Sequence, residues 1–190
     1  MDINDYIRQR RTIKPEKYTE QKIDNAIIQQ ILDNANWAPT HGHTEPWRFI
    51  VFEGAGLQKL GEFHADLYKK ETPEDQFKEN TYQKLIDRPQ LASHVIGIGM
   101  KRGDNPKIPE IEEIEATACA VQNMWLTASA YGLGAYWNSG GMTYHDQMNT
   151  FFGLGFDDKV LGFLYLGYPA VEWPDGKRVS NIDEKVQWIT

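Results

Sequence analysis

Several features are missing from this sequence, and each absence narrows the range of functions. The chain of 190 residues has one cysteine, Cys119, so no disulfide can form within it. Its formal net charge of −7 disfavours nucleic acid or an anionic membrane as the main partner. No segment approaches the roughly 18 apolar residues that a membrane-spanning helix needs, and no apolar signal region opens the chain. We therefore expect a cytoplasmic protein in which Cys119 is a buried, small hydrophobic residue.

Common signatures of nucleotide and nucleophile sites are also missing. Neither G-x-G-x-x-G after a predicted strand nor G-x-x-x-x-G-K-[ST] occurs, so neither a Rossmann dinucleotide site nor a P-loop is indicated. The nucleophile elbow G-x-S-x-G is absent as well. His41 and His43 lie two positions apart, but no carboxylate or cysteine stands at a supporting spacing. We therefore expect no metal site.

Segments with helical and strand-like patterns alternate along the chain. Helices are predicted over 3–11, 20–36 with Thr19 as N-cap, 57–70, 74–86, 110–132, and 144–152 with Thr143 as N-cap. Strands are predicted over 47–52, 94–100, 135–138 and 159–168. This alternation indicates a single α/β or α+β domain over residues 1–190. The polar section that ends at Pro89 is expected to be mobile and to cover a pocket.

The segment 110–141 is the one around which we expect the molecule to be organised. Acidic residues crowd its first turns, where they complement the helix dipole, and apolar residues recur at helical spacing up to a left-handed cap at Gly132. The small residues 116–120 would let another backbone approach closely. A short aromatic strand follows and runs into Ser139-Gly140-Gly141, where a flat ligand could meet backbone N–H groups. The alternative is an ordinary core helix followed by a tight turn.

Two basic clusters stand near opposite ends of this acidic chain. Arg10, Arg11 and Lys14 surround Thr12 where the first predicted helix ends, and together they could hold a phosphate. The alternative is a solvated basic turn. Residues 177–178 form the second cluster, in a polar tail that ends in VQWIT. We expect the tail's last apolar residues, at 188–189, to anchor it to an apolar surface.

Four segments, in this order, resemble the flavin-dependent nitroreductase family, particularly its short single-domain bacterial members. RRTIK at 10–14 is similar to the family's RRS-x-R element, and APTHGHTEPWRFIV at 38–51 is similar to its APS-x-x-N-x-QPW-x-F-x-V element. EATACAVQNMWLTASAYGLGAYWNSG at 115–140 resembles its central helix and following strand. VLGFLYLGYP, then Lys177-Arg178 and VQW, resembles its last strand and C-terminal arm.

The resemblance implies both a fold and a reaction. The fold would be an α+β sandwich with a central mixed sheet flanked by helices, and a C-terminal arm of about residues 170–190 exchanged within a homodimer. FMN would bind at the subunit interface. The reaction would be NAD(P)H-dependent reduction of small electron-poor aromatics, such as nitro compounds and quinones, by a ping-pong hydride mechanism. The alternatives are related FMN chemistry (dehalogenation or flavin breakdown) and a flavin-binding sensor or storage protein without turnover.

The resemblance also implies roles for the basic residues. Arg10 and Thr12, with Arg178 from the far end, would hold the FMN phosphate, and Arg11 would lie beside the phosphate or the ribityl chain. Lys14 would lie near the pyrimidine edge of the flavin, where a cation stabilises the anionic reduced ring. Each charge-assisted hydrogen bond of this kind contributes about 1.5–3 kcal/mol.

Further residues would line the flavin ring, and none is implied as a nucleophile. Gly140 or Gly141 would offer a backbone N–H towards the reactive nitrogen, and His41 or solvent would supply a proton where one is needed. His41 and His43 would belong to the loop of the pocket contributed across the dimer, and Trp37 would bind the cofactor as well. Trp137, Asn138, Ser139 and Gly140 would line the ring.

Three positions depart from the family pattern. Glu45 stands where the family has Gln, His43 where it has Asn, and Lys14 where it has a second Arg. An anionic Glu45 facing the flavin would oppose its reduction, so we expect Glu45 to pair with a cation or to point away. Lysine at position 14 keeps the charge but loses the bidentate geometry of arginine.

Overall fold

A computed structural model describes residues 2–190. Four strands form one sheet in the order β1-β2-β4-β3, in which every neighbouring pair is antiparallel. The sheet is therefore antiparallel rather than mixed, and within residues 2–190 the isolated bridge between Thr12 and Ala135 is the one parallel pairing outside it. The strands are β1 (Trp47–Glu53), β2 (His94–Met100), β3 (Gly134–Asn138) and β4 (Lys159–Gly167).

The connections explain why alternating helices and strands do not give parallel neighbours. Two helices join β1 to β2, so the chain returns to the end of the sheet where β1 stopped and β2 runs the opposite way. A single helix joins β2 to β3, which makes these two strands parallel to each other. However, β4 lies between them and pairs with both in the antiparallel sense.

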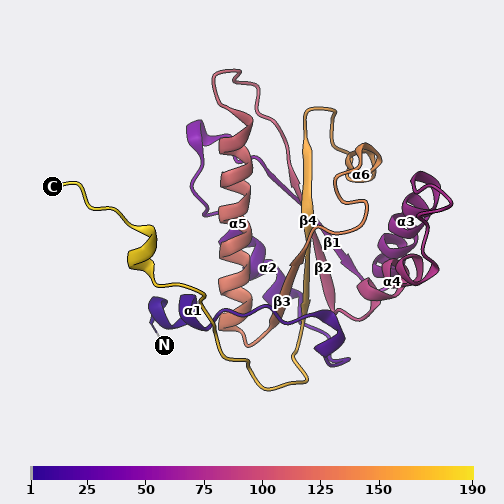
Figure 1. The fold of residues 1–190 in the computed structure, drawn as a ribbon, viewed down its shortest axis with the longest axis horizontal. Coiled ribbons are helices and arrows are strands. Elements are labelled where there is room, and N and C mark those ends of the chain that lie inside the picture. The colour runs from indigo at the N-terminus through magenta and orange to yellow at the C-terminus, as the bar shows by residue number, and fades with distance from the viewer. Residues whose placement is uncertain (1) are drawn as a thin grey trace.

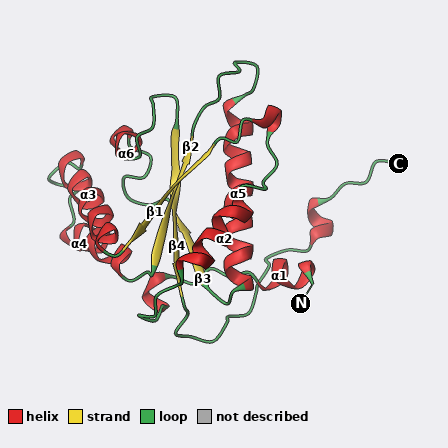
Figure 2. Ribbon diagram, turned by 180° about the vertical axis from the view of Figure 1, so that it is seen from behind, coloured by secondary structure: helices red, strands yellow, loops and turns green. Residues whose placement is uncertain are grey.

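Helices cover both faces of the sheet, which gives the α+β sandwich that was expected (Figures 1 and 2). α2 and α5 lie on one face, with α1 packed against α5, and α3, α4 and α6 lie on the other. The helices are α1 (Ile3–Gln9), α2 (Asn25–Ala35), α3 (Ala55–Glu71), α4 (Glu79–Gln90), α5 (Glu110–Ala130) and α6 (Asp146–Phe151). No helix within residues 2–190 combines the length and the apolar character that crossing a bilayer requires.

The core is divided by the sheet into two apolar clusters. Because successive side chains of a strand point to opposite faces, Leu164 and Leu166 of β4 join the cluster under α2 and α5, whereas Phe163 and Tyr165 join the cluster under α3 and α6. All four are almost completely buried. The near-continuous apolar sequence of β4 therefore follows from its position as a central strand covered on both faces.

Two expected helix starts are wrong because other pairings take their place. Thr19 is not the cap of α2, since its N–H donates to the Tyr168 carbonyl at 2.8 Å and its segment stays extended. The cap is Asp24, whose carboxylate accepts from the Ala26 N–H at 2.8 Å. α6 starts after His145, while the hydroxyl of the buried Thr143 donates to the Gly140 carbonyl.

The central helix α5 ends as expected, with Gly132 in the left-handed region at φ 71°. The expectation for Cys119 is wrong, because this residue is exposed in the single chain. It lies on the same outward face of α5 as Glu115 and Gln122, four residues before it and three after it. The small residues of α5 thus lie partly under the core and partly on an open surface.

The C-terminal segment leaves the body of the molecule after β4. Figure 1 shows it, in yellow, extending away from the sheet, with one short 3₁₀ helix at Ile182–Lys185. Val179, Trp188 and Ile189 are almost fully exposed. The expected apolar anchor for Trp188 and Ile189 is therefore not found among residues 2–190 of the single chain.

Candidate functional site

The basic segment 10–14 lies along the outer edge of the sheet, beside β3. The Ile13 N–H donates to the Ala135 carbonyl at 3.1 Å, next to the bridge between Thr12 and Ala135. Two segments that are far apart in sequence, the RRT element and the aromatic strand, are thereby brought together. They form one side of the candidate site.

The far half of β3 leaves backbone groups open on that edge. Main-chain groups of an edge strand alternate between the paired side and the free side, and the Ala135 carbonyl faces the free side. Trp137, two residues on, presents its main chain to the same side, while its indole N–H donates to the Leu161 carbonyl at 3.1 Å. The strand end from Trp137 to Gly140 can therefore offer backbone hydrogen bonds to a flat ligand.

Arg10 has surroundings that favour the binding of an anionic ligand. Its Nη1 is buried and has no hydrogen-bond partner within residues 2–190, and its guanidinium carbon lies 4.4 Å from the centre of the Trp125 ring. Burial lowers the pKa of Arg10, and the charges of Arg178 and Arg11 lower it further. No carboxylate in the described chain forms an ion pair with any of these arginines. A partly buried cation whose buried Nη1 lacks an acceptor is unfavourable, so this cluster is suited to bind a phosphate.

Arg11 is engaged differently from Arg10. Its Nε donates to the Pro174 carbonyl at 2.9 Å, and its Nη1 donates to the carbonyls of Arg8 and Arg10. These bonds tie the start of the C-terminal segment to the end of α1. The structure therefore gives Arg11 a positioning role beside the cluster, with its Nε and Nη1 already bonded to backbone carbonyls.

Thr12 and Lys14 line a cavity of about 340 Å³ next to the arginine cluster. Val171, Glu172 and Pro174 also line it. This volume lies within the range of small-molecule sites. Lys14 is exposed towards this space.

His41 and His43 lie apart from these residues within one chain, whereas Trp37 lines a surface pocket with Asn123 and Leu126 of α5, close to Trp125 in sequence. The Nδ1 of His41 lies 2.5 Å from Oε2 of Glu112, in the first turn of α5. Trp125, which contacts Arg10, is thirteen residues further along the same helix, about 20 Å away at 1.5 Å per residue. The single chain therefore does not bring the two histidines to the arginine cluster.

The loop that carries the histidines is tightly wound. His43 and Glu45 both have positive φ values, 55° and 41°, which non-glycine residues seldom adopt. Glu45 is exposed and forms no ion pair in the described part of the chain, so the cation partner considered for it is not found there. A backbone held in this conformation is a common feature of ligand-binding loops.

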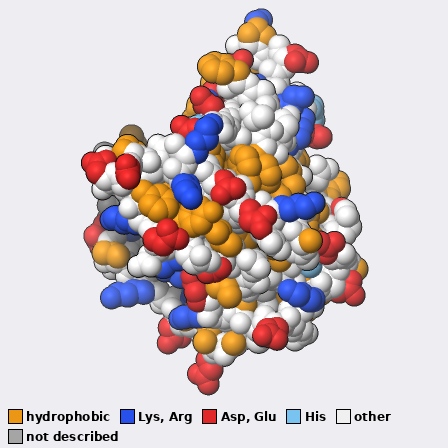
Figure 3. Space-filling model, turned by 90° about the vertical axis from the view of Figure 1, so that its right-hand side faces the viewer, with side chains coloured by type: hydrophobic (Ala, Val, Ile, Leu, Met, Phe, Trp, Pro, Cys, Tyr) orange, Lys and Arg blue, Asp and Glu red, His pale blue; other side chains and the backbone are white. Residues whose placement is uncertain are grey.

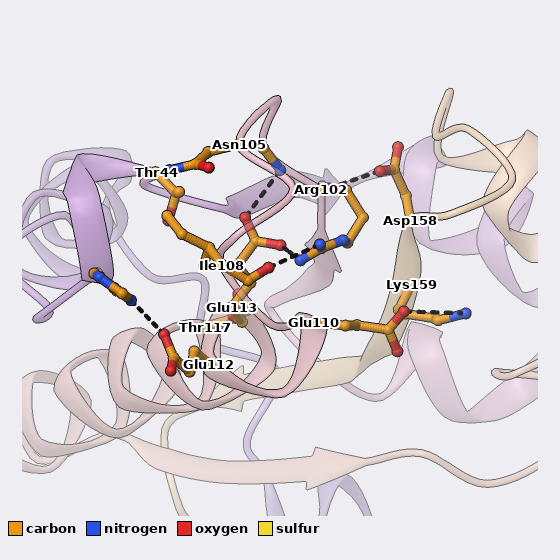
Figure 4. A network of polar contacts seen from close by, with 12 residues as sticks. Thr44, Arg102, Asn105, Ile108, Glu110, Glu112, Glu113, Thr117, Asp158 and Lys159 are labelled. Atoms are coloured by element: carbon orange, nitrogen blue, oxygen red, sulfur yellow. Dashed lines mark hydrogen bonds and ion pairs between the residues drawn. The ribbon is translucent and has the colours of Figure 1, made fainter.

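The polar network at the start of α5 holds the neighbouring loop in place (Figure 4). Glu113 is almost fully buried, pairs with Arg102, and accepts from the Gly103 N–H at 2.9 Å. The Arg102 N–H in turn donates to Asp158 at 2.8 Å. Glu113 therefore does more than complement the helix dipole, which was the role expected from its position in the first turn.

Sequence patterns did not identify Trp125 as part of the site. They placed it on the apolar stripe of α5, yet its ring faces Arg10 and its indole N–H donates to the Arg11 carbonyl at 3.1 Å. The spacing of apolar residues contains no signal for such a contact. No group of three or more metal-ligating side chains occurs within residues 2–190.

Comparison with known proteins identifies the family. The model of the nitroreductase family matches residues 7–168, most of the chain. The chain belongs to the nitroreductase family. It is also 30% identical over 187 residues to "Putative NAD(P)H nitroreductase YfhC" of Bacillus subtilis (strain 168), a match that covers 96% of this chain and 92% of that one.

Solved structures confirm the nitroreductase-like fold. A nitroreductase-like family protein from Bacillus cereus superposes with a TM-score of 0.85 at 29% identity, covering 100% of this chain and 96% of that one. A nitroreductase with bound FMN from Bacteroides fragilis NCTC 9343 superposes with a TM-score of 0.73 at 22% identity, covering 100% of both chains. At the latter identity the likeness concerns the fold alone.

Proposed function

We propose that this nitroreductase-family protein is an FMN-dependent oxidoreductase that uses NAD(P)H to reduce small, electron-poor aromatics such as nitro compounds and quinones. The observation that carries the proposal is the buried Nη1 of Arg10, which lacks a partner within residues 2–190 and lies near Arg178. The phosphate of FMN supplies the missing anion. Thr12 would donate its hydroxyl hydrogen to the same phosphate.

The other residues of the proposed site bind and orient the flavin. Lys14 would place its charge near the pyrimidine edge and stabilise the anionic reduced ring. Trp137, Asn138, Ser139 and Gly140 would line the ring, with the free backbone edge of β3 as hydrogen-bonding surface. When bound, FMN supplies the hydride chemistry, so the protein needs no side-chain nucleophile and no separate nucleotide-binding fold.

We further propose a homodimer in which each site is built from both chains. The rise of about 20 Å along α5 from Glu112, which contacts His41, to Trp125, which contacts Arg10, supports this arrangement, because His41 and His43 can then reach the site of a second copy. The exposed Trp37 would contact that site as well. The exposed Val179, Trp188 and Ile189 of the C-terminal segment support an exchanged arm over about residues 170–190. The cytoplasmic location stays a prediction from the sequence.

The test is a spectrum and an assay of the purified protein. We expect a yellow protein, with the absorption of bound flavin, whose NADPH oxidation speeds up when a nitroaromatic or a quinone is added. Initial rates at several concentrations of both substrates should give parallel double-reciprocal lines, since the donor leaves before the acceptor binds. A bound flavin without acceptor-dependent turnover would instead favour a sensor or storage protein. A colourless protein that cannot be reconstituted with FMN would contradict the proposal.

A further inference from the structure

A small cavity lies between α4 and the turn that follows β3. Its volume is about 150 Å³, and Lys84 and Arg88 of α4 line one side of it. A protein cavity of about this size can hold one benzene ring. It is too small for a complete drug-sized ligand, for which sites start at about 300 Å³. The cavity is thus suited to a single ring or to one substituent of a ring.

The cavity adjoins the proposed flavin site because Asn138 and Gly140 belong to both. Its floor is fixed by close packing of the turn on α3. Gly141 has φ +68°, and a Cβ there would come within 2.5 Å of Nε2 of His64. That nitrogen accepts from the Met142 N–H at 2.8 Å. An acceptor held in this cavity would therefore be held next to the strand end that lines the flavin.

The charge of the cavity is unusual for this chain. Its lining contains two cations one helical turn apart, Lys84 and Arg88, and no Asp or Glu. Glu16 already pairs with Arg88 at 3.2 Å, whereas Lys84 forms no ion pair within residues 2–190. The net charge of the chain is −7. On the face shown in Figure 3, acidic and basic side chains are mixed, so a lining of one sign is a local feature.

The other polar groups of the cavity are neutral at pH 7. Burial lowers the pKa of His64 to about 4, so its imidazole is uncharged. Burial raises the pKa of Tyr165 to about 12, so its phenol keeps its proton. The unpaired charge of the cavity is therefore that of Lys84. A negatively charged substituent would be attracted, and a second cation would be repelled.

We infer that this cavity is a subsite that receives the carboxylate of a single-ring aromatic electron acceptor, with Lys84 as the residue that determines specificity. The inference rests on the proposed function, and it narrows the substrate class to carboxylated nitroarenes and quinones. Lys84 binds the substituent and takes no part in electron transfer. The neutral floor formed by His64 and Tyr165 leaves the carboxylate with one dominant partner.

The test compares two acceptors of nearly equal shape, 4-nitrobenzoate and 4-nitrobenzamide, with the FMN-loaded protein. We expect Lys84→Gln to raise KM for 4-nitrobenzoate about tenfold, the worth of one charge-assisted hydrogen bond, and to change KM for 4-nitrobenzamide less than twofold. Lys84→Arg should restore most of the preference. Lys59→Gln removes an exposed charge from α3, outside the cavity lining, and serves as the matched control.

The outcomes separate this inference from the proposed function. Equal changes for the two acceptors, or none, in Lys84→Gln would overturn the subsite. If the wild type reduces neither acceptor, the proposed function is wrong. The subsite is then tested by titrating the protein with benzoate and monitoring binding through tryptophan fluorescence. Binding of benzoate that weakens about tenfold in Lys84→Gln supports the subsite. Equal affinity of the two proteins for benzoate overturns it.

Discussion

Replacing His64 by glutamine should make the protein less sensitive to acid. His64 lies in α3, is 4% exposed, and its Nε2 accepts from the Met142 N–H at 2.8 Å. Burial lowers its pKa from 6.5 to about 4. The folded state therefore favours the neutral ring, and the resulting stability is fully present above pH 6.5 and is lost as the pH falls towards 4. Protonation would also turn the acceptor of the Met142 N–H into a donor.

The size of the effect follows from the two pKa values. With 6.5 for the unfolded chain and about 4 for the folded one, His64 costs the folded state about 2 kcal/mol at pH 5, and the limit below pH 4 is about 3.4 kcal/mol. The measurement is urea unfolding at pH 7.5 and pH 5, at one protein concentration and one FMN concentration. Glutamine can accept a hydrogen bond but does not titrate.

The comparison of the two proteins isolates His64 from other groups. Burial also lowers the pKa of His94, but that residue is present in both proteins, so its contribution cancels. We expect the wild type to lose about 2 kcal/mol more than His64→Gln between pH 7.5 and pH 5. Equal losses would refute the reasoning that burial keeps this imidazole neutral.

Four further predictions concern separate parts of the molecule. Arg10→Ala and Arg178→Ala should each weaken FMN binding at least tenfold, measured as flavin retained on gel filtration. The far-ultraviolet circular dichroism of both variants should match the wild type, and full flavin retention in both would contradict the phosphate assignment. Glu113→Ala leaves Arg102 without its partner and should lower the free energy of unfolding by about 3 kcal/mol in urea. Asp24→Ala removes the cap of α2 and should cost about 1 kcal/mol in the same assay, whereas Thr19→Ala should cost much less. Deletion of residues 179–190 should convert a dimer into a monomer in light scattering, and an unchanged mass would exclude the arm as the dimer contact.

Sequence patterns predicted those strand bounds and helix ends that depend on neighbouring residues alone. The run His94–Met100 has the bounds of β2, because a strand buried on both faces needs apolar residues throughout. Gly132 ends α5 as expected. Thr19 failed as a cap because its N–H pairs with Tyr168, a contact across most of the chain. Long-range backbone pairing of this kind leaves no trace in the residues on either side of a helix start.

The sequence indicated some residues of the candidate site but not the contacts that they make. The resemblance to the nitroreductase family implied that Arg10 and Arg178 hold one phosphate. The charge of Arg178 lowers the pKa of Arg10, and the phosphate assignment stays a prediction. The resemblance could not indicate that Arg11 turns to the carbonyl of Pro174, or that Trp125 lies beneath Arg10. Lys84 was only part of a polar section thought to cover a pocket. Its proposed role depends on a cavity lining without Asp or Glu and on the lack of an ion pair to Lys84 within residues 2–190, which are properties of packing in three dimensions.

The central position of β4 determines when the protein can fold during synthesis. β2 and β3 have no contact as neighbouring strands until residues 159–167 lie between them. At that stage more than four fifths of the chain has left the ribosome. Until then, the apolar faces of β2 and α5 are not covered by β4. Folding of the nascent chain should therefore be late and concerted, and ribosome-bound chains that stop before β4 should be readily digested by protease.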